Sequence, residues 1–330
     1  MVWGLGALGL AVLHGVAARH PHRRFVGITR DPLRNNGFPP NVRLGDVARL
    51  GVDDAPVLVC VADEEAEVLR QYLVAGQLDL GRAMVARNNR RLFHPAVLGD
   101  RLRHRTVLMV TNPVELMCAR LAQTAGCRAV YGVGMQIDAE RYRDVLRAGW
   151  GIGLGADELP VSGMHGLEAI PVLSAVPGLA ARIAAPPWPV VCDRLHNAAR
   201  TDRLNWLLQP QRLAAVLSRL RPEPDDDPYR RLAIAAQALA AAEFNGWHPP
   251  VHRAGGHMNA LVDSWFTTER VRVSAACQWP PAGGAEVFLG GTLDLATGAF
   301  GLPDLNATEL ERVARQVESM RALTVAVEES

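Results

Sequence analysis

The chain has 330 residues, of which 49% are hydrophobic and 21% are charged, and its formal net charge is +1. This length is enough for two subdomains with substantial cores, and the near-neutral charge gives no support to a nucleic-acid-binding or membrane-binding surface. No lysine occurs among the 35 basic residues, which excludes Schiff-base catalysis and phosphate binding by a Walker lysine. The expected partner is a small molecule.

The cysteines and the N-terminal segment indicate the compartment. The five cysteines include no C-x-x-C pair, and their odd number argues against a disulfide framework. The apolar run at residues 2–18 is followed, not preceded, by arginines at 19–24, which is the reverse of a secretory signal. We therefore expect a cytoplasmic protein without a transmembrane span.

Strands and helices alternate over the first part of the chain. Strands are predicted at residues 1–3, 24–29, 56–62 and 106–111, and helices at about 7–19 and 114–125. This alternation is typical of a doubly wound parallel sheet with helices on both faces.

A glycine-rich turn joins the first strand to the first helix. Gly4, Gly6 and Gly9 form a G-x-G-x-x-G sequence that also contains Ala7 and Leu8. In dinucleotide-binding folds the first glycine permits the turn, the second lets the backbone approach pyrophosphate, and the third lets helix and strand pack closely. Glycine-rich apolar helices produce this pattern by chance, but its place between a strand and a helix favours cofactor binding by these five residues.

The end of the second strand bears on the choice of cofactor. The strand ends in Thr29 and Arg30, with Asp31 after them. A hydroxyl and a guanidinium suit the 2′-phosphate of NADP, which we favour. The alternative is that Arg30 is solvated and Asp31 binds the ribose of NAD. Ala62, at the end of the predicted strand 56–62, is also expected beside the cofactor.

The character of the chain changes after Gly134. Helices are predicted at 138–148 and 230–244, an extended segment at 159–162, and antiparallel strands at 270–276 and 285–289. We therefore expect a dinucleotide-binding domain at 1–134 and an α+β substrate-binding and catalytic domain at 135–330.

A final helix is expected to begin at Thr308, where a T-x-x-E capping box would end at Glu311. Its predicted apolar stripe consists of Leu310, Val313, Val317 and Met320.

No metal site is expected. Two prolines separate His248 from His252 and exclude the helical spacing that would bring two ligands together. We interpret both residues, and His257, as loop histidines.

Three short motifs resemble those of the lactate/malate dehydrogenase family. They are Thr111-Asn112-Pro113-Val114, similar to [ST]-N-P-V, then Gly134 to Arg143, similar to G-T-x-L-D-x-x-R-x-R, and Gly163-Met164-His165-Gly166, similar to G-x-H-G. Their order and spacing agree with the family, and the resemblance covers most of the chain, weakly at 63–90 and 176–260. It implies a Rossmann domain followed by a catalytic domain, a nicotinamide cofactor, a 2-oxo or 2-hydroxy acid substrate, and a homodimer or homotetramer.

The resemblance also implies roles for four residues. His165 would be the proton donor, Asp138 would orient its imidazole, Arg141 would bind the substrate carboxylate, and Asn112 would hold the substrate oxygen or the nicotinamide ribose. The chemistry is suitable, because histidine donates protons near neutral pH and arginine binds a carboxylate with two parallel hydrogen bonds. The bond between Asn112 and Pro113 is a candidate cis peptide. The alternative is a surface Asp138–Arg141 ion pair and an ordinary loop histidine, but the ordered set favours catalysis.

One segment departs from the family pattern. Where the family has a substrate loop containing arginine, this chain has Glu64, Glu65 and Glu67, and Arg82 lies only near the expected position. These carboxylates would repel a second substrate carboxylate, so we expect a monocarboxylic oxo acid in a specialised biosynthetic reaction. The alternative is that they form the solvated first turn of a helix. Two other functions stay open, an imine reductase and a non-catalytic NAD(P)-binding sensor or scaffold.

Overall fold

The computed structural model describes residues 1–30, 37–51, 55–61, 78–98, 100–125, 127, 129–155, 157–166, 169–201, 210–219, 227–243, 251–266, 272–279, 287–294 and 297–328. Some residues with a predicted function or location lie outside these ranges, namely Asp31, Ala62, His248 and the acidic segment 64–67. No helix in the described part of the chain is long and apolar enough to cross a membrane.

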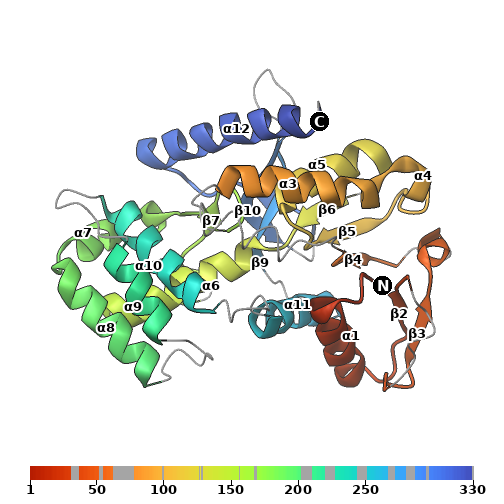
Figure 1. Ribbon diagram of the computed structural model, residues 1–330, viewed down its shortest axis with the longest axis horizontal. Coiled ribbons are helices and arrows are strands. Elements are labelled where there is room, and N and C mark those ends of the chain that lie inside the picture. The colour runs from red at the N-terminus through yellow and green to blue at the C-terminus, as the bar shows by residue number, and fades with distance from the viewer. Residues whose placement is uncertain are drawn as a thin grey trace.

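The main sheet has nine strands in the order β11-β10-β9-β6-β5-β4-β1-β2-β3 (Figure 1). Its strands are β1 (Val2–Trp3), β2 (Phe25–Ile28), β3 (Val42–Gly45), β4 (Val57–Val59), β5 (Thr106–Met109), β6 (Ala129–Gly132), β9 (Arg272–Trp279), β10 (Val287–Asp294) and β11 (Phe300–Gly301). The segment β3-β2-β1-β4-β5-β6 is parallel throughout, and the chain changes direction across the sheet between β1 and β4. This is the doubly wound order of dinucleotide-binding folds, so the predicted fold class is confirmed.

The remaining strands are antiparallel. β9 pairs with β10 over eight residue pairs, β11 extends β10, and β9 joins the parallel strands through a single pair between Gly132 and Ala276. A separate small sheet consists of β7 (Val161–Ser162) and β8 (Ile170–Pro171). The main sheet therefore crosses residue 134, and the division into domains at 134/135 stays a prediction.

Helices cover both faces of the sheet. They are α1 (Ala7–Arg19), α3 (Leu78–Arg90), α4 (Pro95–Leu98), α5 (Val114–Ala125), α6 (Met135–Val145), α7 (Leu179–Ala184), α8 (Trp188–Arg200), α9 (Pro210–Arg219), α10 (Pro228–Glu243), α11 (Val251–Phe266) and α12 (Ala307–Glu328). In Figure 1, α3, α5 and α12 lie on one side of the sheet and α1 and α11 on the other, while α7 to α10 gather beside α6. The sequence did not predict the helices α3, α4, α7, α8, α9 and α11 or the strands β3, β6, β8 and β11.

The central strands explain why the sheet is buried on both faces. In β4, Val57 and Val59 join the core cluster that includes residues of α3, α5 and α12, whereas Leu58 joins the cluster formed with α1 and α11. Successive side chains of a strand point to opposite faces, so an uninterrupted apolar run is buried only when both faces are covered.

α1 and α11 pack against each other along a parallel seam. A Cβ on Gly15 would overlap the side chain of Asn259, and one turn earlier a Cβ on Gly255 would touch Ala11. At the end of the seam Arg19 Nε lies 2.7 Å from the Asp263 carboxylate. Small residues permit this close approach of two helices, and the seam attaches α11 to the helix that follows the glycine turn.

The interpretation of His252 and His257 as loop residues was wrong, because both lie in α11. Pro249 and Pro250 precede the helix and do not interrupt it. His257 Nε2 lies 2.6 Å from Glu140 Oε2, so it joins α11 to α6.

The last helix begins one residue earlier than predicted, at Ala307. Its capping box is formed by Asn306 and Glu309, with the Asn306 Oδ1 accepting from the Glu309 N–H and the Glu309 Oε2 accepting from the Asn306 N–H, both at 2.9 Å. The predicted pair Thr308 and Glu311 does not cap the helix, because the same spacing occurs two residues upstream with a buried acid. Leu310 is 52% exposed, so its placement in the core was wrong. The other three predicted stripe residues are buried, namely Val313, Val317 and Met320.

The Glu309 carboxylate joins three parts of the second half of the chain. It is fully buried and accepts hydrogen bonds from Tyr229 OH in α10 at 2.7 Å, from Ser174 N and Oγ at 3.0 and 2.5 Å, and from Asn306 N. Burial raises the pKa of Glu309, but hydrogen bonds from Ser174, Asn306 and Tyr229 outweigh burial and hold the pKa below its usual value. This carboxylate therefore fixes α10 relative to α12.

Replacing Glu309 by alanine leaves these buried donors without an acceptor. We expect Glu309→Ala to lower the free energy of unfolding by about 3 kcal/mol near neutral pH. A carboxyl whose folded pKa is depressed contributes stability above its unfolded pKa, and this contribution disappears as the pH falls through the folded pKa. The deficit, measured by urea denaturation at several pH values, should shrink in acid. Glu311→Ala, at an exposed position of the same helix, is the control and should change stability by less than about 0.5 kcal/mol.

Candidate active site

In the glycine turn after β1, two of the three glycines have no room for a side chain, and the third has open space around it. Gly4 has φ +96°, and a Cβ there would overlap the backbone of Val61, while a Cβ on Gly9 would overlap the carbonyl oxygen of Gly4. A Cβ on Gly6 would meet no atom within 4 Å. The turn therefore packs against β4 and α1 and leaves open backbone at Gly6, in front of the N-terminus of α1. These residues fit the pyrophosphate of a dinucleotide, which prefers such a helix N-terminus.

The other predicted cofactor residues gather at the same edge of the sheet. Ala7 and Leu8 form the first turn of α1. The N–H of Gly4 donates to the carbonyl of Ile28 at 3.0 Å, so the end of β2 lies directly beside the turn. Thr29 and Arg30 follow it, and the Arg30 side chain is exposed.

Asn112 follows β5 at the same carboxyl edge. Its peptide bond to Pro113 is cis, as predicted. The preceding Thr111 donates its hydroxyl to the Val61 carbonyl at 2.5 Å, and the Asn89 amide donates to the Asn112 carbonyl at 2.7 Å. The backbone of Asn112 is thus held between β4 and α3.

Three of the predicted catalytic residues lie in direct contact. Asp138 and Arg141 are one turn apart on α6, and Arg141 Nη1 donates to Asp138 Oδ1 at 3.0 Å. The other carboxylate oxygen of Asp138 lies 2.6 Å from His165 Nδ1 and accepts the N–H of Gly166 at 2.9 Å. The Asp138 side chain is only 1% exposed and that of Arg141 10%, so this is a buried pair and not the surface ion pair of the alternative interpretation.

Glycines make room for the histidine loop. Gly163 and Gly166 have φ of +82° and +104°, in the left-handed region that favours glycine. A Cβ on Gly134, just before α6, would overlap the imidazole of His165. Gly134, Gly163 and Gly166, from two of the three motifs, therefore all help to place the side chain of His165.

Two further residues hold this loop and were not identified from the sequence. Glu115 Oε1 accepts the N–H of His165 at 2.6 Å, and Gln316 Oε1 accepts the N–H of Met164 at 2.9 Å. An acid in the first turn of a helix is a common feature of helix N-termini, and Gln316 is 152 positions from its partner. No sequence pattern could have distinguished them from ordinary helical residues.

The buried carboxylates determine the protonation of His165. Burial lowers the pKa of His165, but the charges of Asp138 and Glu115 and the hydrogen bond that the imidazole donates to Asp138 outweigh burial and the opposing charge of Arg141, so the net pKa is raised. The imidazole therefore keeps its proton to a higher pH than an ordinary histidine.

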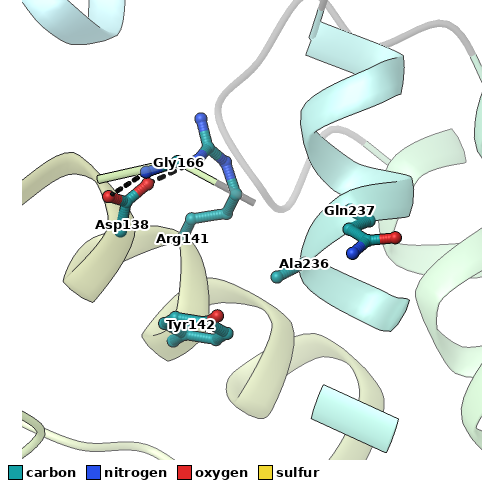
Figure 2. Close-up of a pocket in the computed structure, with 6 residues that line it drawn as sticks. All are labelled: Asp138, Arg141, Tyr142, Gly166, Ala236 and Gln237. Atoms are coloured by element: carbon teal, nitrogen blue, oxygen red, sulfur yellow. Dashed lines mark hydrogen bonds and ion pairs between the residues drawn. The ribbon is translucent and has the colours of Figure 1, made fainter. Parts of the chain in front are cut away.

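A small pocket opens between α6 and α10 beside this cluster. It is lined by Asp138, Arg141, Tyr142, Gly166, Ala236 and Gln237. Figure 2 shows that Arg141 extends from α6 along the gap, while Ala236 projects from α10 toward it. The hydroxyl of Tyr142, one of the lining residues, donates to the Ala169 carbonyl at 2.5 Å. This hydrogen bond connects α6 to the segment after the histidine loop.

Among the residues that the structure describes, no group of three or more His, Cys, Asp or Glu side chains could hold a metal ion. All five cysteines are free thiols.

The pairing of Asp138 with His165 can be tested by Asp138→Asn. The amide keeps the size of the side chain but removes its charge, so the NMR titration of the His165 imidazole should move to lower pH. We expect a loss of about 3 kcal/mol of unfolding free energy on the acidic side of neutral, because the partner charges stay buried.

A group with a raised folded pKa contributes stability below its unfolded pKa, and this contribution disappears as the pH rises through the folded pKa. The stability deficit of Asp138→Asn should therefore become smaller in alkali. Asp100→Asn, at an exposed position, is the control. An unchanged His165 titration in a folded Asp138→Asn protein would contradict the assignment.

Comparison with known proteins identifies the fold. The sequence matches no protein-family model and no curated protein. A lactate dehydrogenase from a Medee basin deep-sea metagenome library matches the structure with a TM-score of 0.66 and 13% identity, over 99% of this chain and 98% of the other. The malate dehydrogenase of Plasmodium falciparum matches with a TM-score of 0.63 and 12% identity, over 99% and 97%. The chain has the fold of the lactate and malate dehydrogenases over nearly its whole length, as the three motifs predicted.

Proposed function

We propose that the chain is a nicotinamide-dependent 2-hydroxyacid dehydrogenase, which interconverts a 2-oxo acid and its 2-hydroxy acid. The observation that carries this proposal is the buried contact of His165 with Asp138, and of Asp138 with Arg141, in the wall of a pocket. Both α6, which carries two of these residues, and the glycine turn follow the carboxyl ends of parallel strands, where ligands bind in open α/β sheets.

Arg141 anchors the substrate carboxylate in this proposal. A guanidinium has five N–H donors, so the hydrogen bond from Nη1 to Asp138 is compatible with binding of a carboxylate by other N–H groups. The pairing with Asp138 also restricts the rotamers of Arg141. The substrate carboxylate would then be placed at a fixed distance from His165.

His165 donates or accepts the proton in this proposal. Because Nδ1 faces the Asp138 carboxylate, Nε2 is the nitrogen that can donate to the substrate oxygen. The bound nicotinamide supplies or accepts the hydride at the carbonyl carbon. During reduction the protonated imidazole donates to the oxygen, and Asp138 stabilises the imidazolium before this donation. In the oxidative direction His165 removes the hydroxyl proton.

The pocket supports a substrate with one carboxylate. Among the described residues that line it, Arg141 is the only cation, and the opposite wall contributes Ala236 and Gln237 from α10. A second carboxylate at this wall would have no cation to offset its desolvation. We therefore propose a monocarboxylic 2-oxo acid.

We propose NADP as the preferred cofactor. The support is the hydroxyl of Thr29 and the exposed guanidinium of Arg30 at the end of β2, beside the glycine turn. Arginine binds a phosphate in bidentate fashion and remains charged at every physiological pH.

The reaction can be tested by following NADPH or NADH oxidation at 340 nm with a panel of monocarboxylic 2-oxo acids. His165→Ala should lower kcat by about 10²–10⁴-fold, which is the usual contribution of a general acid. His22→Ala, at an exposed position, is the control and should keep full activity. Tight cofactor binding without turnover of any oxo acid would contradict the proposal and favour an imine substrate or a non-catalytic role.

Cofactor choice has its own test. Arg30→Ala should raise the KM for NADPH roughly tenfold or more and leave the KM for NADH unchanged, because only the 2′-phosphate loses its charge-assisted hydrogen bonds. Arg24→Ala changes an exposed arginine just before the opposite end of β2 and should affect neither value. An equal effect of Arg30→Ala on both cofactors would assign Arg30 to a part that they share.

A further inference from the structure

The loop that carries His165 has an unusual set of hydrogen bonds. Three successive backbone N–H groups donate to side chains instead of to a neighbouring strand or helix, and each acceptor belongs to a different helix. The pairs are Met164 with Gln316 of α12, His165 with Glu115 of α5, and Gly166 with Asp138 of α6. Buried N–H groups need acceptors, and these side chains satisfy a segment that has no ladder of its own.

Glu115 differs from the other two acceptors in its location. It is the second residue of α5 and lies three positions after Asn112, so a predicted ligand-binding residue and the anchor of the histidine loop lie close together in the chain. Its side chain is only 1% exposed. A buried carboxylate is costly unless it is hydrogen-bonded, and Glu115 accepts a 2.6 Å hydrogen bond while its charge is favoured by the N-terminus of α5.

Among the residues that the structure describes, the charges that act on the imidazole come from two helices. Asp138 and Arg141 lie on α6, and Glu115 lies on α5. Two negative groups and one positive group act on His165, so the balance favours the imidazolium form. Asp138 is paired with Arg141, and the charge of Glu115 acts in the same direction as that of Asp138, raising the pKa of His165.

We propose that Glu115 is a positioning residue for the proton donor: it holds the His165 backbone against the first turn of α5, and its charge acts with that of Asp138 to favour the imidazolium. This inference rests on the proposed reductase function. Glu115 touches neither substrate nor cofactor in this proposal. It acts through His165 and sets the distance between the proton donor and the Asn112 segment.

A glutamine at this position separates the two contributions. The amide oxygen of Glu115→Gln can accept the same N–H at the same distance, so the anchor is kept and only the charge is lost. Glu115→Asp keeps the charge but is shorter by one methylene, so the anchor is weakened. A purely structural role would make the glutamine variant resemble the wild type.

The first measurement is the NMR titration of the His165 imidazole in the complete chain without cofactor, with the His165 signal assigned by its loss in His165→Ala. In Glu115→Gln the titration should move to lower pH, in the same direction as in Asp138→Asn. In Glu115→Asp it should stay near the wild-type position. Glu318→Gln, at an exposed position of α12, is the control and should not move it. A folded Glu115→Gln protein with the wild-type titration would overturn the proposal.

The second measurement is kcat for oxo-acid reduction at two pH values. Glu115→Gln should lose about tenfold more activity near pH 8 than near pH 6, because the imidazole loses its proton earlier. Glu115→Asp should lose activity by a similar factor at both pH values, and unchanged kcat in this variant would overturn the anchoring role. If Glu115→Gln fails to fold, an unchanged kcat in Glu115→Asp still overturns the proposal. If the wild type reduces no oxo acid, the proposed function fails, while the titration still decides the role of Glu115.

Discussion

The Asp138 carboxylate is the group on which the rest of the site depends. It is almost completely buried, and its two oxygens meet the imidazole of His165, the backbone of Gly166 and the guanidinium of Arg141. Each contact reduces the cost of keeping a negative charge in the interior, and each also fixes the geometry of its partner. The helix α6 therefore holds the proposed proton donor and the proposed carboxylate anchor in one cluster.

Close packing by small residues brings this cluster to the cofactor end of the sheet. Gly4 and Gly9 allow β1, β4 and α1 to approach within backbone contact, and Gly134 leaves room for the His165 ring. The seam between α1 and α11 adds a connection to α6 through His257 and Glu140. The distance between the glycine turn and α6 is thus set by packed elements on both sides, and such rigid support is what the precise positioning of two reactants would need.

The local parts of this arrangement could be predicted from the sequence. The G-x-G-x-x-G turn, the helix 114–125 and the three-residue spacing of Asp138 and Arg141 depend on neighbouring residues and on regular periodicities. The cis bond at Pro113 is local too. The capping box shows where local prediction fails. The spacing of a capping box occurs twice, at 306–309 and at 308–311, and only the burial of Glu309 selects the first.

The alternation of strands and helices in the first part of the chain, the glycines of the turn and the residue types that a 2-oxo acid reductase would need can all be predicted from the sequence alone. The folded chain alone shows that Asp138, Arg141 and His165 form one buried cluster, that α10 supplies the opposite wall of the pocket, and that Glu115 and Gln316 hold the histidine loop. The physical reason is sequence separation. Glu115 and His165 are 50 positions apart, Gln316 and Met164 are 152 apart, and no periodicity of a helix or strand extends across such intervals. These contacts form only when the packed sheet places the first turns of α5 and α6 and the middle of α12 around the same loop.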